Sequence, residues 1–283
     1  MPLTPTQTRA LLAQLGVAPR RQLGQNFLVD GNLVRKSLEL ADVQPGDVVV
    51  EVGPGLGTLS EALLAAGAEV FAVEVDRQLE QNLRLTLAPK YPETFHLLEG
   101  DAVEHPRAGL PDTHPAVVKG TYKVVANLPY SICTPWLDAL LGGPLPERLV
   151  LMLQREAAER FTATAGTAER GAISIFTEAA FARAATHTVS RKCFYPEPKV
   201  DSVLLGLTRK PNARAFRAAT KKIIREFFTQ RRKQLGALVR RAEIPALHRW
   251  LEKFPALGLD PRVRPEDVPL AAWVELDQLA GFD

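Results

Sequence analysis

The sequence has 283 residues, of which 46% are hydrophobic and 24% charged, the composition of an ordinary globular protein long enough for about two domains. Its formal net charge of +3 and isoelectric point near 8.9 are compatible with a nucleic-acid partner but do not identify one. No apolar run approaches the roughly 18 residues of a membrane span, and no secretory signal is visible. We therefore expect a cytoplasmic protein without a membrane partner.

Cysteine and histidine usage argues against a disulfide framework and against a structural metal. The two cysteines, Cys133 and Cys193, are too few for a disulfide-stabilised fold and fit a reducing compartment. The histidines are scattered, with no ligand-like spacing among themselves or with the cysteines. We expect no metal site.

Strand and helix patterns alternate from residue 47 onwards, after a short N-terminal helix candidate and a polar stretch. The predicted strands are residues 47–52, 69–76, 94–101, 121–127, 148–153 and 202–209. The predicted helices are residues 58–67, 77–88 and 171–185. This alternation implies βαβ crossovers and a fold of the α/β class, a Rossmann-like, mostly parallel sheet with helices on both faces. We expect this domain to cover residues 1–208.

The strand signal stops beyond Lys210. Apolar residues then recur with helical spacing, and prolines divide the tail into short helical patterns. Basic residues far outnumber acidic ones between residues 209 and 241. We therefore predict a small, basic, all-helical domain at residues 209–283, with the boundary near 207–212.

A glycine-rich turn follows the first predicted strand. Gly53, Gly55 and Gly57 would let a ligand approach the backbone closely, and Glu74 ends the second strand where doubly wound folds place a ribose-binding carboxylate. NAD would require the spacing G-x-G-x-x-G, whereas the spacing here is G-x-G-x-G. This favours S-adenosylmethionine, with Asp101 placed to accept a hydrogen bond from its adenine amine. The alternative is a tight turn with two strand-end caps.

A second cluster, Asn127-Leu128-Pro129-Tyr130, directly follows the fourth predicted strand. The exocyclic amine of adenine is a poor nucleophile unless two acceptors hold its N–H bonds. The Asn127 side-chain oxygen and the Leu128 carbonyl would supply them, with the Tyr130 ring stacked on the base and Pro129 keeping the turn rigid. A strand-ending turn with a half-buried tyrosine is the alternative.

An aromatic pair, Phe194 and Tyr195, lies in a proline-rich loop before the last predicted strand. We expect one of them, Phe194 by preference, to stack on the opposite face of a splayed-out base. A hydrophobic plug at a domain junction is the alternative.

Six motifs occur in order along nearly the whole chain: "LGQNFLVD", "EVGPGLG", "GDA", "NLPY", "FYPEPKVDSV" and "FFTQRRKQL". Together they resemble the ribosomal RNA adenine N6,N6-dimethyltransferases, specifically the KsgA-type enzymes of the bacterial small subunit. The resemblance implies dimethylation of two adjacent adenosines in the 3′-terminal hairpin loop of 16S rRNA, within a maturing 30S particle. S-adenosylmethionine would be the methyl donor and S-adenosylhomocysteine the product. We expect the chain to act as a monomer.

The same resemblance implies the cofactor contacts. They fall on Gln25, Asn26, Leu28, Gly53, Gly55, Glu74, Asp101 and Asn127, with residues 1–30 as an N-terminal extension and cofactor lid. The antibiotic-resistance methyltransferases of large-subunit RNA share "GQNFL" and "NLPY", but "GPGLG" and "QRRKQL" favour the small-subunit family. Cys133 stands where serine is more usual, which we expect to be neutral.

Basic residues are expected to contact ribosomal RNA, each phosphate contact steepening the salt dependence of binding. The candidates are Arg20, Arg21, Lys221, Lys222, Arg225, Arg231, Arg232 and Lys233. A solvated helix face is the alternative.

Two other functions compete with this interpretation. A non-catalytic assembly or transcription factor could keep the fold, but the intact glycine turn and Asn127–Tyr130 cluster argue against it. A DNA adenine methyltransferase would have an Asn/Asp-Pro-Pro-aromatic element, and the second proline is missing here.

Overall fold

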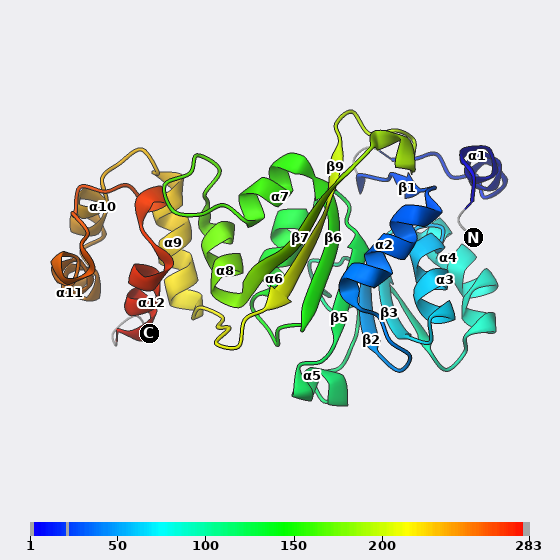
Figure 1. The fold of residues 1–283 in the computed structure, drawn as a ribbon, viewed down its shortest axis with the longest axis horizontal. Coiled ribbons are helices and arrows are strands. Elements are labelled where there is room, and N and C mark those ends of the chain that lie inside the picture. The colour runs from blue at the N-terminus through cyan, green and yellow to red at the C-terminus, as the bar shows by residue number, and fades with distance from the viewer. Residues whose placement is uncertain (1–2, 21–22, 280–283) are drawn as a thin grey trace. The chain divides into compact units, whose positions relative to one another are not determined.

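The computed structural model describes residues 3–20 and 23–279 of the chain (Figure 1). The chain divides into two compact units. The first contains Met1–Ala158 and Ala182–Lys210, and the second contains Glu159–Phe181 and Pro211–Asp283. Within the described residues, no helix has both the length and the apolar character that a membrane crossing requires.

A seven-stranded sheet has the order β4-β3-β2-β5-β6-β9-β7. Its strands are β2 (Val48–Val52), β3 (Glu69–Glu74), β4 (Phe95–Glu99), β5 (Lys123–Asn127), β6 (Arg148–Gln154), β7 (Phe181–Val189) and β9 (Ser202–Arg209). Neighbours from β4 to β6 pair in parallel, and β9 runs antiparallel to β6. The carboxyl ends of β2 to β5 therefore meet at one edge, where open α/β sheets bind their ligands.

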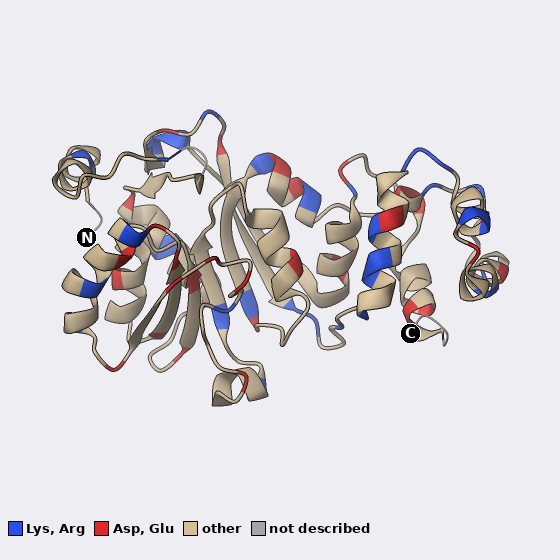
Figure 2. Cartoon of the chain, turned by 180° about the vertical axis from the view of Figure 1, so that it is seen from behind, with Lys and Arg blue, Asp and Glu red and all other residues tan. Residues whose placement is uncertain are grey.

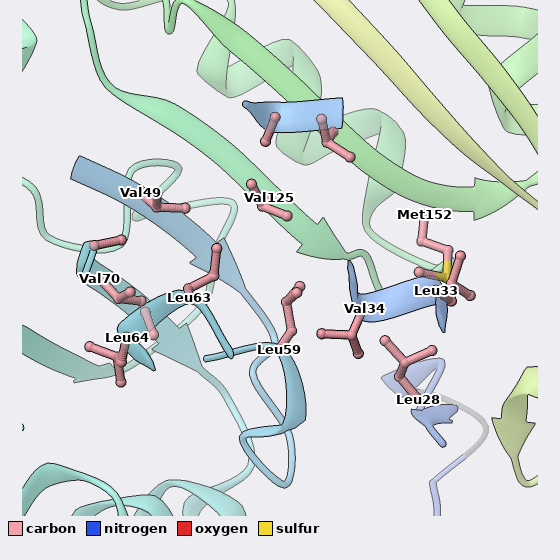
Figure 3. Packing of buried hydrophobic residues seen from close by; sticks show 14 of the residues in the cluster. Leu28, Leu33, Val34, Val49, Leu59, Leu63, Leu64, Val70, Val125 and Met152 are labelled. Carbon is pink, nitrogen blue, oxygen red and sulfur yellow. The ribbon is translucent and has the colours of Figure 1, made fainter. Parts of the chain in front are cut away.

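Helices cover the sheet because its central strands are apolar on both faces. All five residues of β2 are buried. The helices of this part of the chain are α1 (Pro5–Gln14), α2 (Gly31–Ala41), α3 (Thr58–Ala65), α4 (Arg77–Thr86), α5 (Pro115–Lys119), α6 (Cys133–Leu140) and α7 (Arg155–Phe161). In Figure 3, Leu59 and Leu63 of α3 belong to the same buried cluster as Val49 and Val125 of the sheet. This core fixes the turns that follow the strands.

A two-stranded sheet ties the N-terminal extension to the loop before β9. β1 (Phe27–Leu28) pairs antiparallel with β8 (Phe194–Tyr195), and Leu28 lies opposite Phe194. The Arg9 side chain of α1 donates a hydrogen bond to the Tyr195 hydroxyl at 3.2 Å. The extension is therefore anchored by both backbone pairing and side-chain contacts.

The second unit contains α8 (Ala172–Ala180), α9 (Ala218–Thr229), α10 (Leu235–Ala242), α11 (Pro245–Glu252) and α12 (Leu270–Gln278). The indole rings of Trp250 and Trp273, both fully buried, lie 5.0 Å apart in its core. Arg170 is also fully buried and donates hydrogen bonds to the Glu178 carboxylate and the Val268 carbonyl. The bond to Val268 joins residues 159–181 to the segment before α12.

The fold class predicted from the sequence is confirmed, but the structure differs at residues 171–185. The predicted helix ends at Ala180, and the chain continues as β7 at the sheet edge beside β9. Only the first and last residues of β7 are buried, so backbone pairing outweighs the helical propensity of its alanines there. Residues 159–181 belong to the second unit, whereas residues 1–208 were expected to form one domain.

Candidate active site

A pocket lies at the carboxyl ends of β2, β3 and β5, beside the N-terminal segment 23–28. Its empty volume, open solvent included, is about 1060 Å³. The predicted site residues that line it are Gln25, Asn26, Leu28, Gly53, Gly55, Glu74, Asp101, Asn127, Leu128, Pro129 and Tyr130. Residues distant in the sequence are thus gathered in one cavity.

The turn after β2 presents backbone to this pocket. Gly53, Gly55 and Gly57 have φ angles of 67°, 61° and 82°, which residues with a Cβ rarely adopt. A Cβ at Gly55 would lie 3.2 Å from the Phe27 ring. Glycine therefore allows the N-terminal segment to pack closely on the turn.

Glu74, the last residue of β3, has its carboxylate oriented by two backbone amides. Oε2 accepts a hydrogen bond from the Gly55 N–H at 3.0 Å, and Oε1 accepts one from the Asp76 N–H at 2.9 Å. Burial raises the pKa of Glu74 above its ordinary value, and these hydrogen bonds partly offset that rise. Each oxygen has a second lone pair, so the carboxylate can still accept from ligand hydroxyls.

Glu51, the first residue of the motif "EVGPGLG", also lines the pocket, although the sequence predicted no role for it. It is 2% exposed, and no described residue forms a hydrogen bond with its Oε2. Its pKa is raised to about 8, chiefly by burial, while the Ser60 hydroxyl partly offsets the rise and the charge of Glu74 adds to it. The signal that could have found it was a single carboxylate inside the apolar run Val48–Val52, since a buried carboxylate needs a partner or a function.

The side-chain amide of Asn127, at the end of β5, is held in one orientation. Its Nδ2 donates a hydrogen bond to the Asn26 carbonyl oxygen at 2.8 Å. No described residue donates a hydrogen bond to Asn127 Oδ1 or to the Leu128 carbonyl oxygen. The two acceptors that the sequence predicted for an amino group are therefore open at the pocket.

The turn that contains Pro129 and Tyr130 is held on two sides. Its hydroxyl lies 2.6 Å from the Ser202 hydroxyl, and burial raises its pKa while this hydrogen bond partly offsets the rise. On the other side, a Cβ at Gly53 would lie 3.2 Å from the Pro129 ring. The turn is thus packed against the glycine turn and bonded to β9.

The polar groups of Gln25 and Asp101 are partly engaged within the protein. Gln25 Oε1 accepts a hydrogen bond from the Arg20 N–H at 2.8 Å, and its Nε2 donates to Asp76 Oδ2 at 3.0 Å. Gln25 therefore fastens the N-terminal segment to the chain after β3. Asp101 Oδ1 accepts from the Val103 N–H at 2.8 Å, and no described residue bonds to its Oδ2.

The structure does not bring the predicted second aromatic residue to the pocket. Phe194 is 2% exposed, belongs to the core cluster that contains Leu28 and Met152, and does not line the pocket. Tyr195 packs on the N-terminal extension, with the Arg9 guanidinium 5.5 Å from its ring centroid. Pairing of β8 with β1 holds the backbone of both residues there.

The candidate RNA contacts of the second unit lie on α9 and in the segment that follows it, where Figure 2 colours basic residues blue, and they differ in exposure. Lys221 is 6% exposed, with Nζ 5.3 Å from the centroid of the Phe176 ring, which argues against its predicted contact with RNA. Arg225 is exposed and lies over the same ring at 5.5 Å. The remaining candidates are Arg231, whose Nε is 3.4 Å from Glu266, and the exposed Lys222, Arg232 and Lys233.

Two candidates come from the N-terminal extension. Arg20 is exposed, with a guanidinium nitrogen 3.8 Å from the Asp76 carboxylate. Arg21 lies outside the described residues.

A glycine turn that faces an Asn-Leu-Pro-Tyr turn across one pocket is the arrangement of a Rossmann-like S-adenosylmethionine-dependent methyltransferase. Solved structures share the fold. A dimethyladenosine transferase from Plasmodium falciparum has a TM-score of 0.70 and 23% identity, over 88% of this chain and 95% of that one. The 23S rRNA methyltransferase ErmE has a TM-score of 0.63 and 24% identity, over 89% of this chain and 98% of that one.

Sequence comparisons identify the family. Residues 17–271 match the family model described as ribosomal RNA adenine dimethylase. The chain is 58% identical over 273 residues to ribosomal RNA small subunit methyltransferase A of Opitutus terrae, covering 96% of this chain and 97% of that one. It is 38% identical over 287 residues to the protein of the same name from Lactobacillus acidophilus, covering 96% and 95%. The chain belongs to the ribosomal RNA adenine dimethylase family.

Proposed function

We propose that this protein transfers methyl groups from S-adenosylmethionine to N6 of two adjacent adenosines in the 3′-terminal hairpin loop of 16S rRNA. The product at both positions is N6,N6-dimethyladenosine. The substrate is the RNA within the 30S subunit or its precursor, and the protein acts as a monomer in the cytoplasm. The observation that carries the proposal is the pair of open acceptors, Asn127 Oδ1 and the Leu128 carbonyl, beside the glycine turn.

The residues of the pocket fit S-adenosylmethionine. Glu74 is proposed to accept hydrogen bonds from the ribose hydroxyls, and Asp101 from the adenine amine, because each has free acceptor capacity. Oε2 of Glu51, which has no hydrogen-bond partner among the described residues, is proposed to accept a hydrogen bond from the ammonium group of the methionine end. When bound, the cofactor supplies an electrophilic methyl group on a sulfonium sulfur. The other proposed contacts are Gln25, Asn26, Leu28, Gly53, Gly55 and Asn127.

In the proposed mechanism, Asn127 and Leu128 orient the target amine. Because Asn127 Nδ2 donates to the Asn26 carbonyl oxygen, the amide is oriented so that its own oxygen is available to the substrate. In the first transfer, two acceptors hold the two N–H bonds and turn the nitrogen lone pair toward the donated methyl, which favours a near-attack geometry. In the second transfer, the methylated amine has one N–H bond left for one of these acceptors. Tyr130 stacks on the base, and Pro129 limits movement of the turn. No ionised base is needed beforehand, since the amine proton becomes acidic once the methyl is attached.

The exposed basic residues of the second unit are proposed to bind the phosphates of ribosomal RNA. Lys222, Arg232 and Lys233 are the best candidates, because their side chains are exposed. Lys221 is excluded from this surface by its burial over Phe176. Arg225 and Arg231 would contribute to the same surface of the second unit, and Arg20 is a separate candidate in the first unit.

Methyl transfer to purified ribosomal subunits tests the function. With labelled S-adenosylmethionine and unmethylated 30S subunits, we expect label in the 3′ end of 16S rRNA and fragment masses that correspond to two dimethylated adenosines. The 50S subunit is the control and should take up no label. Transfer to 23S rRNA instead would favour a large-subunit enzyme, and stable 30S binding without transfer would favour a non-catalytic assembly factor.

A further inference from the structure

A buried hydroxyl pair links the Asn127 turn to a strand outside the pocket. Ser202, the first residue of β9, is fully buried, and its Oγ lies 2.6 Å from the Tyr130 hydroxyl. In the sheet order β5-β6-β9, β6 separates β5, which leads into the turn with Tyr130, from β9, and the last residue of β6, Gln154, pairs with Ser202. The Tyr130 side chain therefore reaches across the carboxyl end of β6.

The backbone of Tyr130 is held independently. A Cβ at Gly24 would lie 2.9 Å from the Tyr130 backbone nitrogen, so the N-terminal segment packs directly on this peptide. With the backbone held, the ring retains only its two side-chain torsions. The hydroxyl lies on the axis of the second torsion, so its hydrogen bond fixes the direction of that axis. Ser202 thus sets the first torsion, and the surrounding packing sets the second.

We propose that Ser202 is a positioning residue for methyl transfer, which holds the Tyr130 ring where the target adenine stacks against it. The inference rests on the proposed function, in which Tyr130 supports the base that Asn127 and Leu128 grip. Ser202 does not line the pocket and acts through Tyr130 alone. A swing of the ring would move the base plane relative to the donated methyl, and misplacement by about 1 Å can cost on the order of 100-fold in rate.

A purely structural hydrogen bond makes a different kinetic prediction. It would lower stability when removed but would leave kcat unchanged in the folded enzyme. A positioning bond lowers kcat with little effect on the KM for S-adenosylmethionine, because Ser202 is not a cofactor contact. The hydroxyls of Ser202 and Tyr130 would also act as one unit, so the decreases in kcat caused by removing each of them are not additive.

The test is steady-state methylation of unmethylated 30S subunits by the full chain and its variants. We expect Ser202→Ala and Tyr130→Phe each to lower kcat by about tenfold, with the KM for S-adenosylmethionine changed by less than about twofold. The double variant should be no slower than the slower single variant. Ser202→Thr, which retains the hydroxyl, should restore most of the wild-type kcat.

A matched control separates this effect from the removal of any buried hydroxyl. Ser37 is 1% exposed and donates a hydrogen bond to the Leu33 carbonyl at 2.9 Å, so Ser37→Ala should lower the melting temperature without changing kcat. An unchanged kcat in Ser202→Ala, or multiplicative decreases in the double variant, would overturn the inference and leave the proposed function standing. A wild-type enzyme that does not methylate 30S subunits would overturn both.

Discussion

One side-chain amide links two parts of the pocket. Asn127 Nδ2 bonds to the carbonyl of Asn26 in the N-terminal segment, and Asn127 Oδ1 is left open at the end of β5. Rotation of the amide would break a hydrogen bond worth about 0.5–1.5 kcal/mol net, so the oxygen is kept in place before any ligand binds. In the proposed mechanism this preorganisation gives the target amine a fixed acceptor.

Glu51 makes the stability of the protein depend on pH. Its pKa of about 8 in the folded protein lies above the ordinary value of 4.5, so the folded state retains a proton that the unfolded state releases. Below about pH 4 the carboxyl group is protonated in both states and does not change the free energy of unfolding. As the pH rises toward 8, the unfolded state gains stability by releasing the proton, so the free energy of unfolding falls. Glu51→Gln cannot ionise, so we expect it to gain stability relative to the wild type by on the order of 3 kcal/mol between pH 5 and pH 9.

Chemical denaturation of both proteins at the two pH values checks this prediction. The exposed Glu39 supplies the control, because Glu39→Gln should follow the wild type at both pH values. If the free energies of unfolding of the wild type and Glu51→Gln differ by the same amount at both pH values, Glu51 titrates like an exposed carboxyl group and the prediction is wrong.

At the scale of elements, α9 carries two kinds of basic residue. Lys221 is buried over Phe176, whereas Lys222 is exposed one position further along. We predict that Lys222→Glu combined with Arg232→Glu weakens 30S binding. The slope of the logarithm of the binding constant against the logarithm of the salt concentration should become less negative by about 0.7–0.9 for each phosphate that the variant no longer neutralises.

Filter binding or fluorescence anisotropy over a salt series measures that slope. Lys36→Glu, a charge reversal at a half-exposed lysine of α2 in the first unit, is the matched control and should leave the slope unchanged. If the double variant and the control give the same slope as the wild type, these residues form only a solvated face.

Elements with strong periodicity could be predicted from the sequence, and short or weakly patterned ones could not. The strand predicted at residues 47–52 corresponds to β2, and the helical spacing beyond Lys210 includes α9. β1 and β8 have two residues each, too few to carry a period, and they exist because they pair with each other. β7 is exposed along most of its length, so no alternation marked it.

At the scale of the whole molecule, the predicted pocket residues converge because parallel strands bring their carboxyl ends to one edge. That rule places Glu74, Asp101 and Asn127 together without knowledge of side-chain packing. It does not say which way a side chain turns, so the burial of Phe194 and Lys221 had to come from the structure. Glu51 was not predicted because its apolar neighbours on β2 indicate a buried strand and give no role to the carboxylate between them.

The pocket belongs entirely to the first unit, and the basic residues that remain candidates for RNA contact belong mainly to the second. In the proposed function, the first unit therefore supplies the chemistry and the second supplies most of the affinity for RNA. Changes in the two units should have separable effects, on turnover in one case and on the salt dependence of binding in the other.

The most direct test of the central claim is single-turnover methyl transfer to unmethylated 30S subunits by Asn127→Ala, with cofactor affinity measured on the same preparation. Because the Asn127 oxygen is proposed to orient the amine, we expect the rate to fall on the order of 100-fold while S-adenosylmethionine affinity stays within about tenfold. Near-normal transfer by this variant would contradict the account, as would a decrease in rate explained wholly by weaker cofactor binding.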